Sequence, residues 1–461
     1  MANLWSGRFS SEPDPVAFQF GSSFRFDRRL FEDDVTGSLA WVEALIGAGV
    51  FNKADADKVS AALNEILERG RREPAFVDGP DEDVHAFVER QLVERVGDLG
   101  KRLHTGRSRN EQVSLDLRLY LRRQIPTLQK QVAAVIAALA TKAESAGNAV
   151  MPSYTHLRRA MPVLVAHFFL AHVAALRRDY DRFGWASQEA DAMPLGSGAV
   201  AGTNYAMDTA MLATRLGFSR VVSNSIDASS DRDFVAAFLH ACAMLMVHLS
   251  RLSEDLIIFC DEEHGFFQLS DASSTGSSMM PQKKNPDPLE LIRGKSGRLI
   301  GHLTGWLTTM KGLPSGYNKD LQEDKEAVFD AEDNVAGALA TLVGVVDGLE
   351  IFPNTTAAAA SGLLLATDVA DFLVGKGMPF REAHEVVGGM VRQLVAENRD
   401  FSALTTAEWR RHSALFDETV HGVVTPDASV RARKTPQSTQ PQAVSAALAE
   451  VKGWLRRVGA P

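Results

Sequence analysis

The chain has 461 residues, of which 45% are hydrophobic, and its formal net charge is −9. This length exceeds what one hydrophobic core usually holds, so we expect two or three domains. The acidic balance, with no run of five or more basic residues, argues against nucleic acid as a partner. An anionic substrate would have to be bound by local cations against an unfavourable overall charge.

Cysteine content and hydropathy bear on the compartment. Cys242 and Cys260 lie on one predicted helix about 27 Å apart, too far to form a disulfide bond. No charged-then-apolar leader follows Met1. The most apolar run, 161–176, contains two histidines and is shorter than the ~20 residues of a membrane span. We therefore expect a cytoplasmic protein with no membrane partner.

Residues 1–107 mix short segments with helical ones and are predicted to form an N-terminal domain. The three acids at 81–83 precede an amphipathic helix, whose positive end they would stabilise. Ser108 and Glu111 have the spacing of a capping box, so a long helix is predicted to begin at Arg109. A cation in the first turn opposes the helix dipole, which favours a bound anion there, although first-turn arginines are also common.

Long helical patterns dominate residues 108–360, which we predict to be a central domain. In the stretch 231–263, apolar residues recur at spacings of three and four, close to the 3.5-residue repeat of a bundle seam. The predicted helices, all far above the ~11-residue average, are 109–147 with a kink at Pro126, 157–190, 231–263, 286–311 and 322–349. They predict an all-α fold built on a long-helix bundle, whose seams commonly continue into subunit contacts.

Shorter helices are predicted after residue 351, at 366–376, 381–398 and 443–458, so 361–461 is predicted to be a small helical domain. Upstream, Gly196, Gly198 and Ala201 match the dinucleotide pattern G-x-G-x-x-A. No strand precedes them, so we interpret the stretch as a tight turn between helices. Without an H-E-x-x-H motif or paired-cysteine spacing, we expect neither a metal site nor a cofactor.

The stretch 273–295, SSTGSSMMPQKKNPDPLELIRGK, combines features that favour an anion. Its small polar opening predicts a mobile loop. Lys283 and Lys284 follow, and then Asn285 and Pro286 predict a helix that begins with Asn285 as N-cap. Ammonium groups and a positive helix end thus come together. On composition alone, a solvated surface loop is an equally good explanation.

The sequence GSSMMPQKKNP, 276–286, resembles the signature loop of the fumarase/aspartase superfamily. That resemblance implies an all-helical homotetramer that eliminates an amine or hydroxide from a succinyl group and releases fumarate. LHTGRSRN (103–110), PLGSGAVAGT (194–203), LPSGYNKDLQEDKE (313–326) and GMPFREAH (377–384) narrow the resemblance to the argininosuccinate lyase family. The implied reaction splits argininosuccinate into arginine and fumarate.

The resemblance also implies roles for individual residues. Ser277 and His156 would be the acid-base pair, in either order, and Lys283 would stabilise the aci-carboxylate formed after proton removal. The implied ligands of the substrate are Arg109, Asn110, Thr155 and Asn285 for the succinyl carboxylates, with Ser23, Tyr317, Gln322 and Lys325 completing the pocket. In this family three subunits build each site, which would explain why these residues are scattered along the chain.

Read without the resemblance, the same residues are less informative. A serine in a Gly/Ser loop and a single histidine are structural more often than catalytic. Ser277 could act as a base only if its alkoxide were stabilised, with Lys283 nearby and water excluded by loop closure. The chemistry therefore depends on how the fold surrounds these groups.

Three positions depart from the family pattern, and two alternatives stay open. Arg158 and Met161 stand where the family usually has glutamine, and Glu111 replaces an aspartate. Arg158 would either lower the pKa of His156 or point to solvent. One alternative function is a sister lyase such as adenylosuccinate lyase, although no phosphate-binding set is found. The other is a structural protein without catalysis, like the lens crystallins related to this family.

Overall fold

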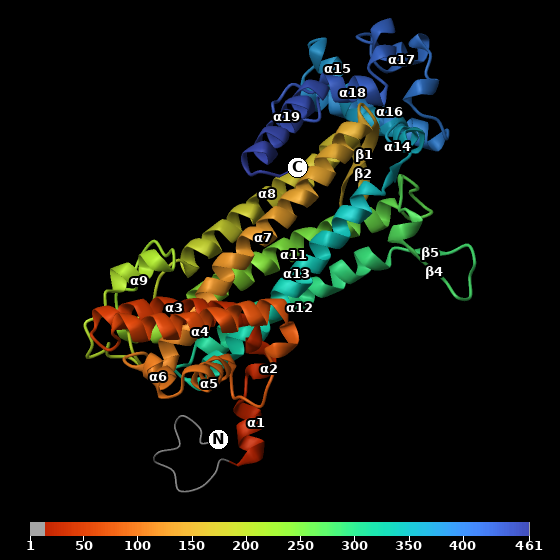
Figure 1. Ribbon diagram of the computed structural model, residues 1–461. Coiled ribbons are helices and arrows are strands. Elements are labelled where there is room, and N and C mark those ends of the chain that lie inside the picture. The colour runs from red at the N-terminus through yellow and green to blue at the C-terminus, as the bar shows by residue number, and fades with distance from the viewer. Residues whose placement is uncertain (1–13, 461) are drawn as a thin grey trace. The chain divides into compact units, whose positions relative to one another are not determined.

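The computed structural model describes residues 14–460 (Figure 1). Its contacts divide the chain into two compact units. Unit 1 comprises the chain up to Gln129, Asp181–Ala243 and Arg298–Val335, and unit 2 comprises Lys130–Tyr180, Met244–Gly297 and the chain from Ala336 onward. The division predicted from sequence has three domains, each continuous in sequence, with boundaries after residues 107 and 360. That three-domain division stays a proposal.

Five long helices confirm the predicted all-α fold. They are α7 (Arg109–Ala146), α8 (Val165–Ala190), α11 (Asp233–Phe259), α12 (Asp287–Met310) and α13 (Asp324–Asp347). The apolar seam predicted for α11 is buried, with Phe234, Phe238 and Cys242 each 0% exposed. Pro126 lies inside α7 without ending it.

Helix α11 is also the one helix of the described chain that is long and apolar enough to cross a membrane. Length and composition alone make this test weak, since core helices of soluble proteins pass it too. Here 56% of the most apolar window is buried inside the fold, as expected of a core helix.

Shorter helices complete unit 1, and side chains cap several of them. They are α1 (Pro15–Gly21), α2 (Phe24–Asp27), α3 (Phe31–Gly47), α4 (Lys53–Arg72), α5 (Val84–Val96), α6 (Asp98–Lys101), α9 (Thr209–Arg215) and α10 (Ser225–Ser230). Asp83 accepts the Ala86 N–H at 2.8 Å as N-cap of α5, so the helix-stabilising role predicted for the acids at 81–83 is confirmed for Asp83. Asp81 instead pairs with Arg90 at 2.7 Å.

The predicted helix start at Leu157 is wrong, because the chain forms a β-hairpin before α8. Strand β1 (Val150–Thr155) pairs antiparallel with β2 (Arg158–Leu164). His156 and Leu157 form the turn with φ of 53° and 55°, the left-handed conformation that two-residue hairpin turns require. Pro162 also disfavours a helix that begins at Leu157, because it has no N–H to donate.

Two further antiparallel pairs are only two residues long. Strands β3 (Phe267–Gln268) and β6 (Glu350–Ile351) form one, and β4 (Thr275–Gly276) and β5 (Lys284–Asn285) form the other. The described 3-10 helices are Arg28–Leu30, Pro74–Phe76, Arg102–His104, Asp271–Ser273, Lys319–Glu323, Gly362–Leu365, Phe401–Ala403 and Glu418–Gly422.

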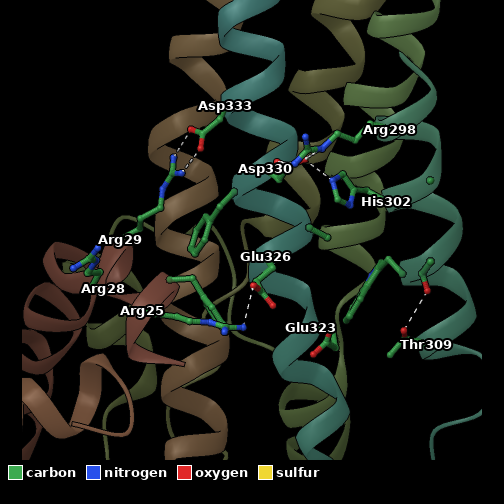
Figure 2. Close-up of a pocket in the computed structure, with 16 residues that line it drawn as sticks. Arg25, Arg28, Arg29, Arg298, His302, Thr309, Glu323, Glu326, Asp330 and Asp333 are labelled. Carbon is green, nitrogen blue, oxygen red and sulfur yellow. Dashed lines mark hydrogen bonds and ion pairs between the residues drawn. The ribbon is translucent and has the colours of Figure 1, made fainter. Parts of the chain in front are cut away.

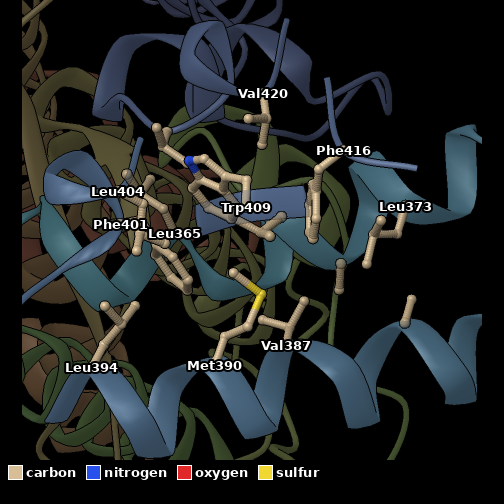
Figure 3. Close-up of a cluster of buried hydrophobic side chains, with 14 residues drawn as sticks. Leu365, Leu373, Val387, Met390, Leu394, Phe401, Leu404, Trp409, Phe416 and Val420 are labelled. Carbon is tan, nitrogen blue, oxygen red and sulfur yellow. The ribbon is translucent and has the colours of Figure 1, made fainter. Parts of the chain in front are cut away.

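The C-terminal part of unit 2 has its own hydrophobic core (Figure 3). Its helices are α14 (Pro353–Ala359), α15 (Ala366–Gly375), α16 (Phe380–Ala396), α17 (Thr406–His412), α18 (Pro426–Ala432) and α19 (Pro441–Arg457). Trp409 is fully buried and stacks on Phe401 with ring centroids 5.6 Å apart. The helices predicted in this region are confirmed, with boundaries that differ by at most two residues.

Replacing Leu157 by asparagine should stabilise the hairpin. Leu157 is 81% exposed at a left-handed turn position, which asparagine adopts at a cost lower by roughly 0.5 to 1 kcal/mol. We expect the thermal midpoint to rise by about 1 °C or more, whereas Leu157→Ala keeps the unfavourable backbone and should give no rise. A lower midpoint for Leu157→Asn would contradict this account, because it would show that the leucine is packed in the assembled protein.

Candidate functional site

In unit 1, Ser23 is held by a buried carboxylate. Its hydroxyl donates a hydrogen bond to Asp27, and its N–H donates to the Glu82 carbonyl at 2.8 Å. Asp27 also accepts the Val84 N–H at 3.0 Å, which ties the start of α2 to the start of α5. Burial raises the pKa of Asp27 to about 6, although the charge of His85 and the Ser23 hydrogen bond lower it.

The predicted carboxylate ligands Arg109 and Asn110 lie in the first turn of α7. Arg109 Nη1 is 3.2 Å from the carboxylate of Asp83, the residue that caps α5. This first-turn cation therefore has a counter-ion in the protein, and its position alone no longer requires a bound anion. Asn110 donates its N–H to the Ser108 hydroxyl at 3.2 Å.

The predicted capping box at the start of α7 is half formed. Glu111 accepts the Ser108 N–H at 2.9 Å, but the Ser108 hydroxyl bonds to Asn110 and not to the Glu111 N–H. The second oxygen of Glu111 accepts the Gly198 N–H at 2.9 Å. Glu111 is fully buried, and burial raises its pKa to about 7. This carboxyl thus joins the start of α7 to the glycine loop at 194–203.

The glycine loop confirms the interpretation as a turn between helices. Gly198 has φ of 59°, and a Cβ there would lie 2.3 Å from the Gly202 carbonyl oxygen. Only glycine fits such a close approach. The loop does not follow a parallel strand with a crossover helix, so the dinucleotide interpretation has no structural support in the described chain.

The remaining predicted residues of unit 1 precede or begin α13. Lys325 Nζ donates to Asp324 at 2.7 Å, and the other oxygen of that carboxylate accepts from Arg232 Nε at 2.8 Å. Gln322 donates to the Gly21 carbonyl at 3.2 Å, close in sequence to Ser23. Burial raises the pKa of Tyr317, with the charge of Arg232 opposing it. The predicted residues of unit 1 thus lie on neighbouring, hydrogen-bonded segments.

In unit 2, Ser277 follows directly after β4. Its Oγ accepts the N–H groups of Met279 at 3.2 Å and Met280 at 3.0 Å. Lys283 is exposed and comes just before β5, so the same hairpin carries both residues. Two amide donors on one hydroxyl oxygen favour negative charge on that oxygen.

The helix start predicted at Asn285 is displaced by one residue. Asn285 belongs to β5 and pairs with Thr275, while α12 begins at Asp287. The Pro286 carbonyl accepts the N–H groups of the first helical turn, so Pro286 takes the N-cap position. Pairing in the hairpin holds the Asn285 backbone extended, which prevents it from capping α12.

Thr155 and His156 are both exposed, Thr155 at the end of β1 and His156 in the turn of the β1/β2 hairpin. Arg158 pairs with Thr155 across the ladder and is exposed as well, which favours the solvent-facing alternative for this arginine. Met161 is half-buried, and its backbone bonds to the Ser153 hydroxyl in both directions, at 2.8 and 3.2 Å.

A cavity of about 720 Å³ lies elsewhere in unit 1. Figure 2 shows that several of its charged side chains face one another in pairs. Arg29 bonds to Asp333 at 2.8 Å, and Arg298 bonds to Asp330 at 2.7 Å. Among the described residues, none of the eleven predicted site residues lines it. Its cations are already neutralised, so we do not assign it to the binding of an anionic substrate.

One buried group in the described chain has the spacing of metal ligands. The ligand atoms of Asp34, His85 and Asp116 lie within 4.8 Å of one another. His85 Nδ1 is already 2.6 Å from Asp34, to which Gln112 also donates at 2.6 Å. Burial and the charge of Asp34 raise the pKa of Asp116 well above its usual range. The carboxylate of Asp34 is thus the shared acceptor of this buried group, while His85 Nε2 and both carboxylate oxygens of Asp116 have no hydrogen-bond partner in the described chain.

Sequence reasoning missed the groups that hold the predicted residues. Asp27, Arg232 and Asp324 are each at most 1% exposed, and each bonds to a predicted site residue or to its partner. Asp324 directly precedes Lys325 in sequence, but i,i+1 neighbours on a helix do not normally face each other. No local pattern could therefore have identified Arg232 and Asp324 as partners, whereas Asp27 is only four residues from Ser23.

The sequence was compared with protein families and curated proteins. A family model described as "Lyase" matches residues 7–301, and one described as "Argininosuccinate lyase C-terminal" matches residues 363–431. A relative from Moorella thermoacetica named argininosuccinate lyase is 45% identical over 99% of both chains. A relative of the same name from Roseiflexus sp. is 46% identical over 97% of this chain and 99% of that protein.

Solved structures show the same fold at low identity. A variant of EDDS lyase with bound fumarate has a TM-score of 0.83 at 22% identity, covering 97% of this chain and 91% of that one. Class II fumarase from Schistosoma mansoni has a TM-score of 0.76 at 14% identity, covering 89% and 92%. These similarities establish the fold alone.

Replacing Glu111 by glutamine should flatten the pH dependence of stability. Folding raises the pKa of this carboxyl from 4.5 to about 7. Its contribution is complete below pH 4.5 and is lost as the pH rises through about 7, since the folded state then gives up a proton that it holds more tightly. The glutamine variant should also be less stable overall, because an amide oxygen replaces two acceptors.

The test is the thermal midpoint of both proteins between about pH 4.5 and 8. Asp27 and Asp33, whose pKa values burial also raises to about 6, titrate in the same range in both proteins, so the difference between the curves isolates Glu111. Parallel curves would contradict the assignment.

Proposed function

The chain belongs to the argininosuccinate lyase family of carbon–nitrogen lyases, and we propose that it splits argininosuccinate into arginine and fumarate as a step of arginine biosynthesis. The observation that carries the proposal is 45% identity over 99% of both chains to a relative of that name. Similarity of that extent disfavours a sister lyase. Two free cysteines fit a cytoplasmic enzyme, and we propose neither a cofactor nor a nucleic acid or membrane partner.

For catalysis, we assign Ser277 as the base and His156 as the acid. The reaction removes a proton from the succinyl carbon and places two negative charges on the adjacent carboxylate. The amides of Met279 and Met280, which donate to Ser277 Oγ, would stabilise its alkoxide. The ammonium group of Lys283 would stabilise the negative charge of the aci-carboxylate. As the C–N bond breaks, His156 would protonate the departing guanidine nitrogen, so that arginine leaves with its side chain as a guanidinium.

The other predicted residues would hold the substrate in place. Arg109, Asn110, Thr155 and Asn285 would bind the succinyl carboxylates, while Ser23, Tyr317, Gln322 and Lys325 would complete the pocket. What supports this assignment in unit 1 is the hydrogen-bonded framework around these groups, in which Asp27 orients Ser23 and Asp83 orients Arg109. A positioned cation acts more strongly than a mobile one, since little reorganisation is needed during the reaction.

We also propose that the enzyme is a homotetramer with active sites shared among subunits. The support is the exposed surface of α12. Its glycines Gly294, Gly297, Gly301 and Gly305 have no atom within 4 Å of a Cβ position. Leu291, Ile300 and Leu307 on the same helix are 61%, 45% and 51% exposed. Small residues beside exposed aliphatic ones allow close packing of a partner helix.

Replacing Ser277 by alanine should reduce turnover on the order of 10³-fold, because it removes both the base and its stabilised oxyanion. Fumarate release is followed by its absorbance and arginine release by chromatography, and the wild type should release the two in equal amounts. Ser278→Ala, one residue away and more exposed, is the matched control and should keep its activity. Substantial turnover by Ser277→Ala would refute its role, and no release by the folded wild type would refute the proposed function.

Placing glutamate at both Ile300 and Leu307 should dissociate the tetramer, because two charges would be buried in an apolar contact without partners. Light scattering after size-exclusion chromatography measures the mass. Leu415→Glu, at a 39% exposed leucine of the C-terminal part, is the control and should leave the mass unchanged. A double variant that still has the tetrameric mass would show that the side of α12 with Ile300 and Leu307 is not the interface.

A further inference from the structure

A chain of alternating charges runs through unit 1 and ends at Lys325. Arg118 forms an ion pair with Asp231, whose main-chain oxygen accepts from Arg232 Nη1 at 2.8 Å. Arg232 Nε then donates to Asp324 at 2.8 Å, and Lys325 donates to the other oxygen of Asp324 at 2.7 Å. The side chains of Arg232 and Asp324 are 0% exposed and that of Lys325 is 3% exposed.

In this network of five side chains, the positive charges outnumber the negative ones. Arg118 and Asp231 neutralise each other at one end. At the other end, the single carboxylate of Asp324 is shared by two cations, Arg232 and Lys325. Within these five residues one positive charge is therefore left over where the network reaches Lys325, and the nearby carboxylate of Asp27, whose pKa the charge of Lys325 lowers, offsets part of it. In a buried environment such a surplus acts strongly on a nearby anion.

Arg232 also has an unmet donor. Its Nη2 is buried and has no hydrogen-bond partner, which is uncommon for a buried charged group. Arg232 is close enough to Tyr317 for its charge to be the main influence that lowers the pKa of that tyrosine against the effect of burial. Arg232 thus interacts with two residues of the proposed pocket. It is linked to Lys325 by hydrogen bonds through Asp324, and its charge acts on Tyr317 without a hydrogen bond.

We propose that Arg232 is a positioning residue for Lys325: by taking half of the Asp324 carboxylate, it leaves the Lys325 ammonium free to attract a carboxylate of the substrate. Without Arg232, Asp324 would neutralise Lys325 alone, and the pair would carry no net charge. This inference rests on the proposed function, which supplies the dicarboxylate ligand. It adds a residue that touches no substrate atom and acts through another side chain.

The test is a double-mutant cycle on fumarate binding by the purified full-length protein, measured by calorimetry. Arg232→Met and Lys325→Met should each weaken fumarate affinity by about tenfold or more. If Arg232 acts through Lys325, the double variant should bind fumarate no more weakly than Lys325→Met alone. Additive losses would overturn the proposal, because Arg232 would then act independently of Lys325.

Arg118→Met is the matched control, since Arg118 is also a nearly fully buried arginine paired with one carboxylate. It should keep the fumarate affinity of the wild type, and an equal loss there would indicate a general structural effect and overturn the proposal. If Arg232→Met does not fold, Arg232→Gln, whose amide can still donate to Asp324 without a charge, takes its place in the cycle.

Cleavage of argininosuccinate by the wild type is measured in parallel, so that the two ideas fail separately. An active wild type with unchanged fumarate affinity in Arg232→Met would remove this inference alone. A wild type that binds fumarate but does not cleave argininosuccinate would remove the proposed function while leaving the cycle interpretable.

Discussion

The proposed anion-binding part of unit 1 depends on the carboxylate of Asp324. It accepts hydrogen bonds from both Arg232 and Lys325, and all three side chains are buried. Charges in a helical core must be paired, and removing one partner of a buried pair costs about 3 to 5 kcal/mol. The hydrogen bonds of Asp324 therefore do two things: they pair the buried charges, and they fix the position of the Lys325 ammonium group.

The same principle recurs around the other predicted ligands of unit 1. Asp83 caps α5 and pairs with Arg109, and Asp27 binds the Ser23 hydroxyl while accepting a backbone N–H of α5. Each carboxylate thus stabilises a helix start and orients a side chain of the proposed pocket. Stability and site geometry are consequently coupled, so variants at these acids should affect both.

Most of the fold could be predicted because apolar periodicity extends over whole helices. The seam of α11, with its spacing of three and four residues, is buried as expected, and a local pattern suffices for such an element. The β1/β2 hairpin escaped prediction because His156 and Leu157 occupy the left-handed turn positions where asparagine and glycine are the usual signal. Pro162, which disfavours a helix interior, was the available sign against a helix start at residue 157.

The site was predictable to a different extent. The roles of Ser277, Lys283 and Lys325 came from a resemblance in short motifs. Their supporting contacts, such as the bond between Arg232 and Asp324, join residues 92 positions apart. Local spacing carries no information on pairs of that kind, and burial of a charged side chain cannot be read from its own neighbours. Short motifs therefore indicated which residues to consider, but only the fold shows which buried side chains hold them in position.

The central claim is that residues scattered along the chain act together because several subunits contribute to each active site. Mixing refolded Ser277→Ala chains with Lys325→Met chains tests it most directly. If a site takes these two residues from different subunits, hybrid tetramers should regain up to roughly a quarter of wild-type activity, since that fraction of sites would contain neither substitution. Hybrids that form, as shown by mass, yet stay as inactive as each variant alone would contradict the claim.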